Sequence, residues 1–334
     1  MDGDDTWVER AGGPMEIRFS AEDVARIRFA ISPLWEAVAG VRVLKGADQQ
    51  GLHRWWAERA RTAIAAAKLD LSPLSRLLPV PGGVPSFLVQ PPTTPQPSLE
   101  VELAALRATP IDSLHTTITA ARPGVDALQA EGERGLAHLV ETIDAFWEVA
   151  IAPYWPRVLS LLEGDILHRA RRFAEGGASL LLGDLDPQLS WETDTLQLTS
   201  RYRRGVCRLG GRGLLLLPSA FVWPRIFSNV VEHDRQPTLR YPPRGIGNLW
   251  GRRAQPCPAA LARVLGRSRA LLLTELTEPA STTDLSRRTG LTPGGVSQHL
   301  TALRAAGLVS AHRTGRVVLY ARTHVAETLL ASNG

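Results

Sequence analysis

The sequence contains little cysteine, little lysine and no long apolar run. Its two cysteines, Cys207 and Cys257, cannot form a disulfide framework, and this scarcity fits a reducing compartment. No stretch reaches the roughly 18 consecutive apolar residues that a membrane span needs. The opening Met1-Asp-Gly-Asp-Asp is acidic and holds no apolar segment, so no signal peptide is expected. The sequence therefore predicts a cytoplasmic chain that does not enter a membrane.

Motifs that carry catalysis or bind a metal are also missing. The sequence has no Gly-x-Ser-x-Gly elbow, no His-Glu-x-x-His and no phosphate-binding loop. Residues 270–285 contain neither cysteine nor histidine, and His324 has no second ligand at metal-binding spacing. We therefore predict no catalytic residue, no cofactor and no metal site. An enzyme with an unrecognised activity in its N-terminal part is the main alternative.

The charge is concentrated at the C-terminal end of the chain. The 334 residues are enough for two domains, and the formal net charge is +5. Residues 256–334 hold nine arginines and four acidic residues, and nine minus four is the whole +5. A basic module on a neutral body is expected of a nucleic-acid-binding protein, although a solvated surface can also carry such a charge.

Residues 281–290 carry the signals of a short helix. Ser281 or Thr282 can accept a backbone N–H as the N-cap, and Asp284 falls in the first turn, where a carboxylate suits the helix dipole. Gly290 can adopt the left-handed conformation that ends a helix. The pattern predicts a helix that closes with a tight turn.

A second helix is predicted to follow at once, and then a hairpin. Thr292 is the expected N-cap and Pro293 suits the first turn. Val296, Leu300 and Leu303 recur at helical spacing, so one face is apolar and the other carries small or uncharged polar residues. Residues 308–309 and 317–320 read as strands around a basic turn at 311–316. This order of elements is typical of a winged helix-turn-helix.

The same residues resemble a known family. The pattern Leu291-Thr-Pro-Gly-Gly-Val-Ser-Gln-His-Leu300, followed by Leu303-Arg and Gly307-Leu-Val, resembles the ArsR group of bacterial transcription regulators. The resemblance covers about the last quarter of the chain. It implies sequence-specific binding of double-stranded DNA; the structural alternative is a small helical subdomain of an enzyme.

This interpretation assigns candidate DNA contacts along the two helices and the wing. The residues expected to touch bases or phosphates are Thr282, Thr292, Gly294, Gly295, Ser297, Gln298, His299, Thr301, Arg304, Arg313, Thr314 and Arg316. Gln298 can form a bidentate contact with adenine, and the arginines suit phosphates. For Ser297 and His299, hydrogen bonding on the helix surface is the alternative. In the resembled group, dimers form through the helices that flank the winged domain, here residues 258–265 and 325–330, which implies a homodimer on an inverted repeat.

The N-terminal part predicts a mixed domain over residues 15–250, so the fold class is α+β. The first 14 residues are expected to be a flexible leader and residues 251–257 a linker before the DNA-binding domain at 258–334. Helices are expected at residues 20–31, 34–44, 53–67, 99–108, 125–146 and 154–176. Period-two patterns at 189–198, 205–209, 213–218 and 238–241 predict antiparallel strands. Eight prolines between residues 71 and 98 exclude a long helix there and leave a proline-rich docking ligand as an alternative.

The N-terminal residues also suggest a sensor. Glu16-Ile-Arg-Phe-Ser20 and Ser32-Pro-Leu-Trp-Glu-Ala37 resemble the N-terminal domain of a two-domain actinobacterial subset of ArsR-like regulators, a resemblance that implies no ligand. All nine tryptophans precede the basic module. Most are expected to fill a core, but Trp191, Trp223, Arg225 and Tyr241 are candidates for a pocket that binds a small apolar or aromatic effector. A regulator that contacts another protein instead is the third possibility.

Overall fold

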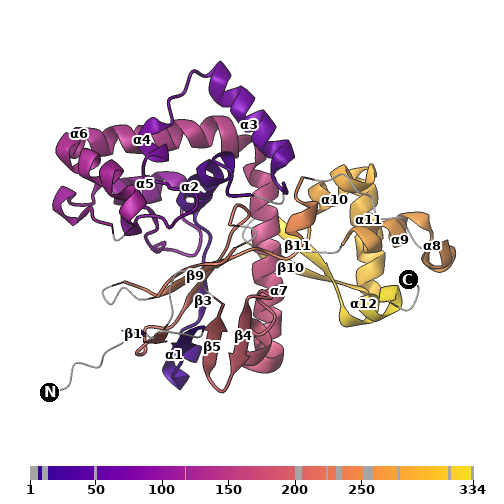
Figure 1. The fold of residues 1–334 in the computed structure, drawn as a ribbon. Helices are drawn as coiled ribbons and strands as arrows, with labels where there is room; N and C mark the ends of the chain where they lie inside the picture. The colour runs from indigo at the N-terminus through magenta and orange to yellow at the C-terminus, as the bar shows by residue number, and fades with distance from the viewer. Residues whose placement is uncertain are drawn as a thin grey trace. The chain divides into compact units, whose positions relative to one another are not determined.

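The computed structural model of the protein describes residues 7–9, 14–48, 51–116, 118–199, 205–222, 225–230, 235–250, 259–276, 279–314 and 317–331. Compactness divides the chain into two units. The first unit combines Met1–Trp155 with Arg171–Pro242, and the second combines Pro156–Ala170 with Pro243–Gly334. The second unit is therefore built from two separate stretches of sequence (Figure 1).

The N-terminus of the helix at residues 33–44 is specified by its own sequence. Ser32 accepts a hydrogen bond from the backbone N–H of Trp35 at 3.0 Å, and Pro33 occupies the first turn of α2 (Pro33–Leu44). Almost every residue of α2 is buried, so other parts of the chain cover this helix on nearly all sides. The helices predicted at 34–44, 53–67, 99–108 and 125–146 are confirmed as α2, α3 (Arg54–Ala66), α5 (Leu99–Arg107) and α6 (Arg122–Phe146). The π-helical η4 (Trp147–Ile151) and η5 (Ala152–Tyr154) follow α6.

The proline-rich segment contains no long helix, as predicted. Only α4 (Ser72–Ser75) and the 3₁₀ turn η1 (Ser86–Leu88) form between residues 71 and 98. Arg42 on α2 anchors this segment, because its guanidinium donates to the carbonyl oxygens of Pro79, Gly82 and Gly83 at 3.1, 2.7 and 3.0 Å. The 3₁₀ turns η2 (Ile111–Ser113) and η3 (Thr119–Ala121) connect α5 to α6.

The first predicted helix is shorter than expected. The helix predicted at residues 20–31 is observed only as α1 (Ala21–Ala25). The chain then forms β3 (Arg28–Phe29) instead of continuing the helix to residue 31. The backbone N–H groups of Arg28 and Ala30 donate to Leu214 and Leu216 at 3.0 and 3.1 Å. A partner this distant in sequence overrides the local helical pattern.

Two sheets complete the first unit, and both are mixed. One has the order β1-β6-β2-β5-β4 and the other β3-β7-β9-β8. The strands are β1 (Trp7–Glu9), β2 (Met15–Arg18), β4 (Leu189–Glu192), β5 (Thr195–Leu198), β6 (Gly205–Arg208), β7 (Leu215–Pro218), β8 (Phe227–Asn229) and β9 (Thr238–Tyr241). The prediction of antiparallel sheets is wrong for three pairs, since β2–β6, β3–β7 and β7–β9 run parallel.

The structure differs from the sequence prediction at residues 189–198 and at residues 7–9. Residues 189–198, predicted as one strand, form a hairpin of β4 and β5, because Thr193 and Asp194 both adopt positive φ angles of 41° and 61°. Residues 7–9 lie in the stretch expected to be a flexible leader, yet they form β1 and pair with β6. Residues 251–257, the expected linker, lie outside the described residues.

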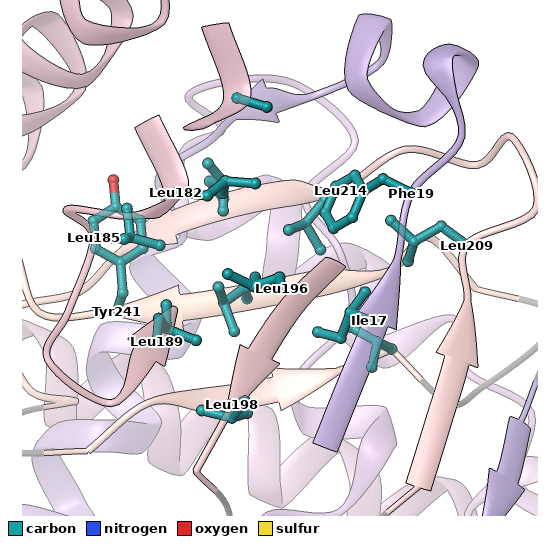
Figure 2. Close-up of a cluster of buried hydrophobic side chains, with 14 of the residues drawn as sticks. Ile17, Phe19, Leu182, Leu185, Leu189, Leu196, Leu198, Leu209, Leu214 and Tyr241 are labelled. Carbon is teal, nitrogen blue, oxygen red and sulfur yellow. The ribbon is translucent and has the colours of Figure 1, made fainter. Parts of the chain in front are cut away.

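One core of the first unit lies where the two sheets meet the end of α7. Figure 2 shows Ile17, Leu196 and Leu198 from one sheet gathered with Tyr241 from the other. Helix α7 (Trp155–Leu182) extends past the predicted end at residue 176, with a kink at Gly176 and Gly177, and its last turns add Leu181 and Leu182 to this core. Residues Pro156–Ala170 of α7 belong to the second unit.

In its described residues the second unit contains five helices and a hairpin besides its part of α7. They are α8 (Ala259–Leu265), α9 (Arg267–Glu275), α10 (Thr282–Thr289), α11 (Pro293–Ala305), α12 (His324–Ala331), β10 (Val309–Thr314) and β11 (Val317–Arg322), after the 3₁₀ turn η6 (Ile246–Asn248). Buried side chains from α8 to β10 and from α12, among them Leu273, Leu285 and Leu300, form one core.

Candidate nucleic-acid interface

Helix α10 is closed at both ends by its own sequence. Ser281 is the N-cap: its hydroxyl accepts from the backbone N–H of Asp284 at 3.2 Å and donates to the Asp284 carboxylate at 2.6 Å. Gly290 ends the helix with a φ of 74°, a conformation that costs a residue with a side chain about 1 kcal/mol or more. Both predictions from the sequence are confirmed, with Ser281 rather than Thr282 as the cap.

Helix α11 starts after a two-residue connection and is also capped as predicted. Thr292 accepts a hydrogen bond from the backbone N–H of Gly295 at 3.2 Å, and Pro293 occupies the first turn. Val296, Leu300 and Leu303 are fully buried in the core of the second unit. They fix the rotation of α11 and thereby decide which residues point outward.

From Pro293 to Thr301 the outward face of α11 is polar, uncharged and open. Ser297, Gln298 and Thr301 are exposed, and Thr301 donates to the carbonyl of Ser297 at 2.9 Å. A Cβ atom added at Gly294 would meet nothing within 4 Å. This absence of bulk and charge lets a second surface approach the helix closely, with Gln298 free to present both an amide donor and a carbonyl acceptor.

The remaining predicted contacts fall around this face. Thr282 is half-buried in the first turn of α10, His299 is half-buried on α11, Gly295 is half-buried and Arg304 is exposed. The backbones of Arg313 and Thr314 lie at the end of β10, and Arg316 lies outside the described residues. The structure thus brings the predicted residues of α10 and α11 onto adjoining helices.

The hairpin is attached to the helices by main-chain and arginine contacts. Ala280 and Tyr320 exchange two backbone hydrogen bonds, each of 2.9 Å, so the segment before α10 pairs with β11. Arg322 donates from Nε to the carbonyl of Leu273 at 2.7 Å and from Nη2 to that of Thr274. Arg322, one of the nine C-terminal arginines, therefore binds the end of α9 and holds β11 in place.

Asp284 of the second unit is a heavily hydrogen-bonded carboxylate. It accepts hydrogen bonds from Ser281, Arg287 and, across 124 positions of sequence, Ser160 at 3.0 Å. Burial alone would raise the pKa of Asp284, but the hydrogen bonds from Ser281, Ser160 and Arg287 lower it below its ordinary value. The group is held as an anion at the N-terminus of α10.

Three of the four predicted effector residues lie within the described part of the chain. Trp191 packs on the core between the two sheets and the end of α7, and it contacts Phe19 edge-to-face, with ring centroids 5.1 Å apart. Tyr241 is fully buried in the same core, whereas Arg225 is exposed. Trp223 lies outside the described residues. Trp191 and Tyr241 thus belong to one core.

The sequence interpretation overlooked a buried charged cluster in the first unit. Glu36 accepts from the backbone N–H groups of Ala220 and Phe221 at 3.1 and 3.3 Å. Glu102 accepts from the Ser32 hydroxyl at 2.7 Å and from the backbone N–H of Leu34 at 2.8 Å. Both carboxylates therefore satisfy main-chain donors at the start of α2 and after β7.

Arg240 supplies the positive charge of this cluster. Its guanidinium carbon lies 4.6 Å from the centroid of the Trp35 ring, and it donates to Thr238 and to the carbonyl of Val89 at 3.0 and 2.9 Å. Arg240 is fully buried. Glu36, a lone acid within the apolar stretch at residues 34–44, was the sequence signal that pointed to such a cluster.

Burial perturbs the titration of every member. It raises the pKa of Glu36 to about 8 and that of Glu102 to about 7, against the lowering effect of their hydrogen bonds and of Arg240. Burial lowers the pKa of Arg240 to about 10. His53, which packs on Phe221 with ring centroids 5.0 Å apart, has its pKa lowered to about 4, again mainly by burial.

Comparison with known families decides what α9 to β10 represent. Residues 266–311 match the model of the bacterial regulatory protein, arsR family. The matched arsR-type helix-turn-helix indicates a DNA-binding transcriptional regulator and points to a non-enzymatic protein. No curated protein and no solved structure matches the chain. The match does not include the N-terminal residues, so the resemblance of residues 16–37 stays a prediction.

The described residues show neither a metal-binding cluster nor a membrane-spanning helix. No group of three or more His, Cys, Asp and Glu side chains in the described part of the chain is placed to hold a metal ion. Among the described helices, none is both long and apolar enough to cross a membrane.

Proposed function

We propose that this protein is a sequence-specific repressor that binds an inverted repeat as a homodimer through a winged helix-turn-helix. The observation that carries the proposal is the open polar face of α11, uncharged from Pro293 to Thr301, within the arsR-type match. In a helix-turn-helix the second helix enters the major groove, where donor and acceptor patterns distinguish the base pairs. The net charge of +5, all of it from residues 256–334, supports binding to a polyanion.

The proposed contacts are those predicted from the sequence, and the exposure of Ser297, Gln298, Thr301 and Arg304 supports them. Gln298 reads a base edge, with Ser297, Thr301 and Thr292 beside it, and Gly294 and Gly295 allow the helix to approach. Arg304 and His299 contact phosphates, together with Thr282 at the start of α10. In the wing, Arg313, Thr314 and Arg316 follow the backbone or the minor groove.

Dimerisation is supported by apolar residues exposed on the two flanking helices. Val264 on α8 and Val325 on α12 are 81% and 62% exposed in the single chain. Isolated apolar residues on a surface are common, but these two lie in the segments where the resembled group forms dimers. One recognition helix buries little surface, so a symmetric pair supplies the affinity that a specific site needs.

The N-terminal unit is proposed to bind a small apolar or aromatic effector that changes DNA affinity. The proposed effector contacts remain Trp191, Trp223, Arg225 and Tyr241, and the packing of Trp191 and Tyr241 on one apolar cluster of the first unit supports the proposal. A ligand screen that changes neither the melting temperature nor DNA affinity would count against an effector.

DNA binding is tested by fluorescence anisotropy with sites selected from a random duplex library and with scrambled duplexes. Gln298→Ala is expected to reduce discrimination between the selected site and its adenine variant by about 1–3 kcal/mol, or about 5- to 150-fold. Arg304→Ala is expected to weaken binding to all duplexes alike and to reduce the salt slope by about 1. Equal, weak binding of the unaltered protein to all duplexes would contradict the proposal.

The dimer is tested by sedimentation equilibrium. Val264→Glu and Val325→Glu are expected to shift the protein toward monomer and to lower DNA affinity, because each places a charge in the proposed interface. The matched control is Val101→Glu, which alters an apolar residue that is 49% exposed on α5 of the first unit. A monomeric unaltered protein, or variants that sediment like the control, would contradict the dimer.

A further inference from the structure

One face of α7 lies against the helix-turn-helix. Ser160, Gly164 and His168 follow one another at intervals of four residues, so they share one side of the helix. All three belong to the stretch Pro156–Ala170, which is part of the second unit although it precedes the family match by about a hundred residues. Each of the three contacts a different piece of that unit.

Ser160 makes the first of these contacts, with helix α10. Its hydroxyl donates to Oδ2 of Asp284 at 3.0 Å, and both residues are buried. Asp284 is also the residue that closes the capping box with Ser281. A hydrogen bond to an ionised carboxylate is stronger than one between neutral groups, so Ser160 is tied firmly to the N-terminal turn of α10.

Gly164 makes the second contact, with the segment that leads into α10. A Cβ atom at position 164 would lie 3.0 Å from the carbonyl oxygen of Pro279, closer than side-chain carbons normally approach. The backbone of α7 therefore rests directly on this segment, and glycine is what allows it. The adjoining Ala280 pairs with β11, so the contact lies between α7, α10 and the hairpin.

The third contact holds α7 to residues just after the first unit. Asp165 accepts from the backbone N–H of Arg244 at 3.0 Å, and the Arg244 guanidinium lies 2.8 Å from Nδ1 of His168. One turn before Ser160, Arg157 lies near Arg287 and Arg288; burial first, and then these two charges, lower its pKa. The contacts thus extend over the whole stretch 157–168.

We infer that residues 156–170 of α7 hold helix α10 in position for DNA binding, with Ser160 as a positioning residue that acts through Asp284. This inference rests on the proposed function. Helix α10 carries Leu285 into the same core as Val296 and Leu300 of α11. A shift of α10 therefore changes the presentation of the α11 face, although Ser160 touches no DNA.

The first test measures DNA affinity of the full-length protein for its selected duplex. Ser160→Ala removes the donor and is expected to weaken specific binding about fivefold to tenfold without changing the salt slope. Ser160→Thr, which keeps a hydroxyl, is expected to restore most of the affinity. Gly164→Ala is expected to weaken binding as well, because its methyl group must displace the Pro279 carbonyl. The matched control, Ser179→Ala, alters an exposed serine of α7 in the first unit and is expected to bind like the unaltered protein.

The second test measures hydrogen exchange without DNA. Ser160→Ala is expected to accelerate exchange in the peptide covering residues 281–290 and to leave the first unit unchanged, while Ser160→Thr restores protection. Unchanged exchange in that peptide, or an equal loss of protection throughout the chain, would overturn the inference, since the second pattern marks a general stabilising role.

The two tests separate failure of the inference from failure of the proposed function. If the unaltered protein binds its duplex specifically and Ser160→Ala binds equally well, the inference is wrong and the regulator stands. If the unaltered protein prefers no duplex, the proposed function fails, and the exchange of residues 281–290 alone decides whether Ser160 positions α10.

Discussion

Glu36 makes the stability of the first unit depend on pH in an unusual direction. Its carboxyl group is fully buried, and burial raises its pKa from 4.5 to about 8. A raised folded-state pKa means that the folded protein binds a proton that the unfolded chain releases near neutrality. The stability contributed by this proton is complete below pH 4.5 and is lost as the pH rises through 8.

The size of the effect follows from the two pKa values. Between pH 6.5 and pH 8.5, the loss for Glu36 alone is about 2 kcal/mol in the free energy of unfolding. Glu102, with its pKa raised to about 7, adds about 1 kcal/mol over the same interval. His53 acts in the opposite sense: its pKa is lowered to about 4, so its contribution is complete above pH 6.5 and is lost as the pH falls toward 4. Between pH 4.5 and 6.5 the gain from His53 offsets only one of the two losses, so the summed contribution of the three groups is greatest near pH 4.5 and falls as the pH rises to about 8.

Tryptophan fluorescence is the suitable assay. Eight of the nine tryptophans belong to the first unit and Trp250 belongs to the second. Urea unfolding followed by tryptophan emission therefore reports mainly on the first unit. The unaltered protein is expected to lose stability from pH 6.5 to 8.5. Glu36→Gln keeps a carbonyl oxygen for the N–H groups of Ala220 and Phe221 and cannot ionise, so its pH profile is expected to be flatter by about 2 kcal/mol.

An exposed glutamate on α5 provides the control for Glu36→Gln. Glu100→Gln alters an exposed acid on α5 and is expected to keep the steep profile of the unaltered protein. Stability that is constant or rises from pH 6.5 to 8.5 would show that Glu36 is ionised in the folded state. A Glu36→Gln profile as steep as that of the control would assign the pH dependence to other groups.

Three further substitutions test the local structure. Thr292→Ala removes the cap of α11 and should cost about 1 kcal/mol, whereas Thr292→Ser should cost little; thermal unfolding followed by circular dichroism distinguishes them. Trp35→Phe loses the 2.8 Å hydrogen bond to Ser219 and should cost about 1–3 kcal/mol by urea unfolding, with no change in DNA affinity. Arg322→Met should release the carbonyls that end α9 and accelerate hydrogen exchange in residues 270–276; unchanged exchange would contradict its role.

The helix-turn-helix could be predicted from the sequence because its signals are local. Ser281, Gly290 and Thr292 mark helix ends within one turn of where they act, and Val296, Leu300 and Leu303 fix the buried face of α11 by spacing alone. The family match covers the same residues. The candidate DNA contacts on α11 are exposed because that spacing leaves them on the other face.

The sheets of the first unit could not be predicted in the same way, because their pairing joins distant residues. Arg28 and Phe29 carry a helical pattern, yet β7, some 190 residues later, draws them into a parallel pair. Likewise, nothing near Thr193 and Asp194 resembles the usual Asn-Gly or Asp-Gly turn, so one predicted strand became two. The charged cluster of Glu36, Glu102 and Arg240 is formed by three elements, and only the lone acid in α2 hinted at it.

Because α7 supplies residues 156–170 to the second unit, the protein cannot be divided by a single cut. A fragment cut at residues 251–257 would carry the whole family match but would leave behind Ser160 and Gly164, and with them the partner of Asp284. Grafting the C-terminal residues onto another sensor would meet the same difficulty, because the scaffold of α10 is encoded upstream of the graft. Module exchange in this protein therefore requires moving two pieces of sequence together, and a simple fusion at residues 251–257 moves only one.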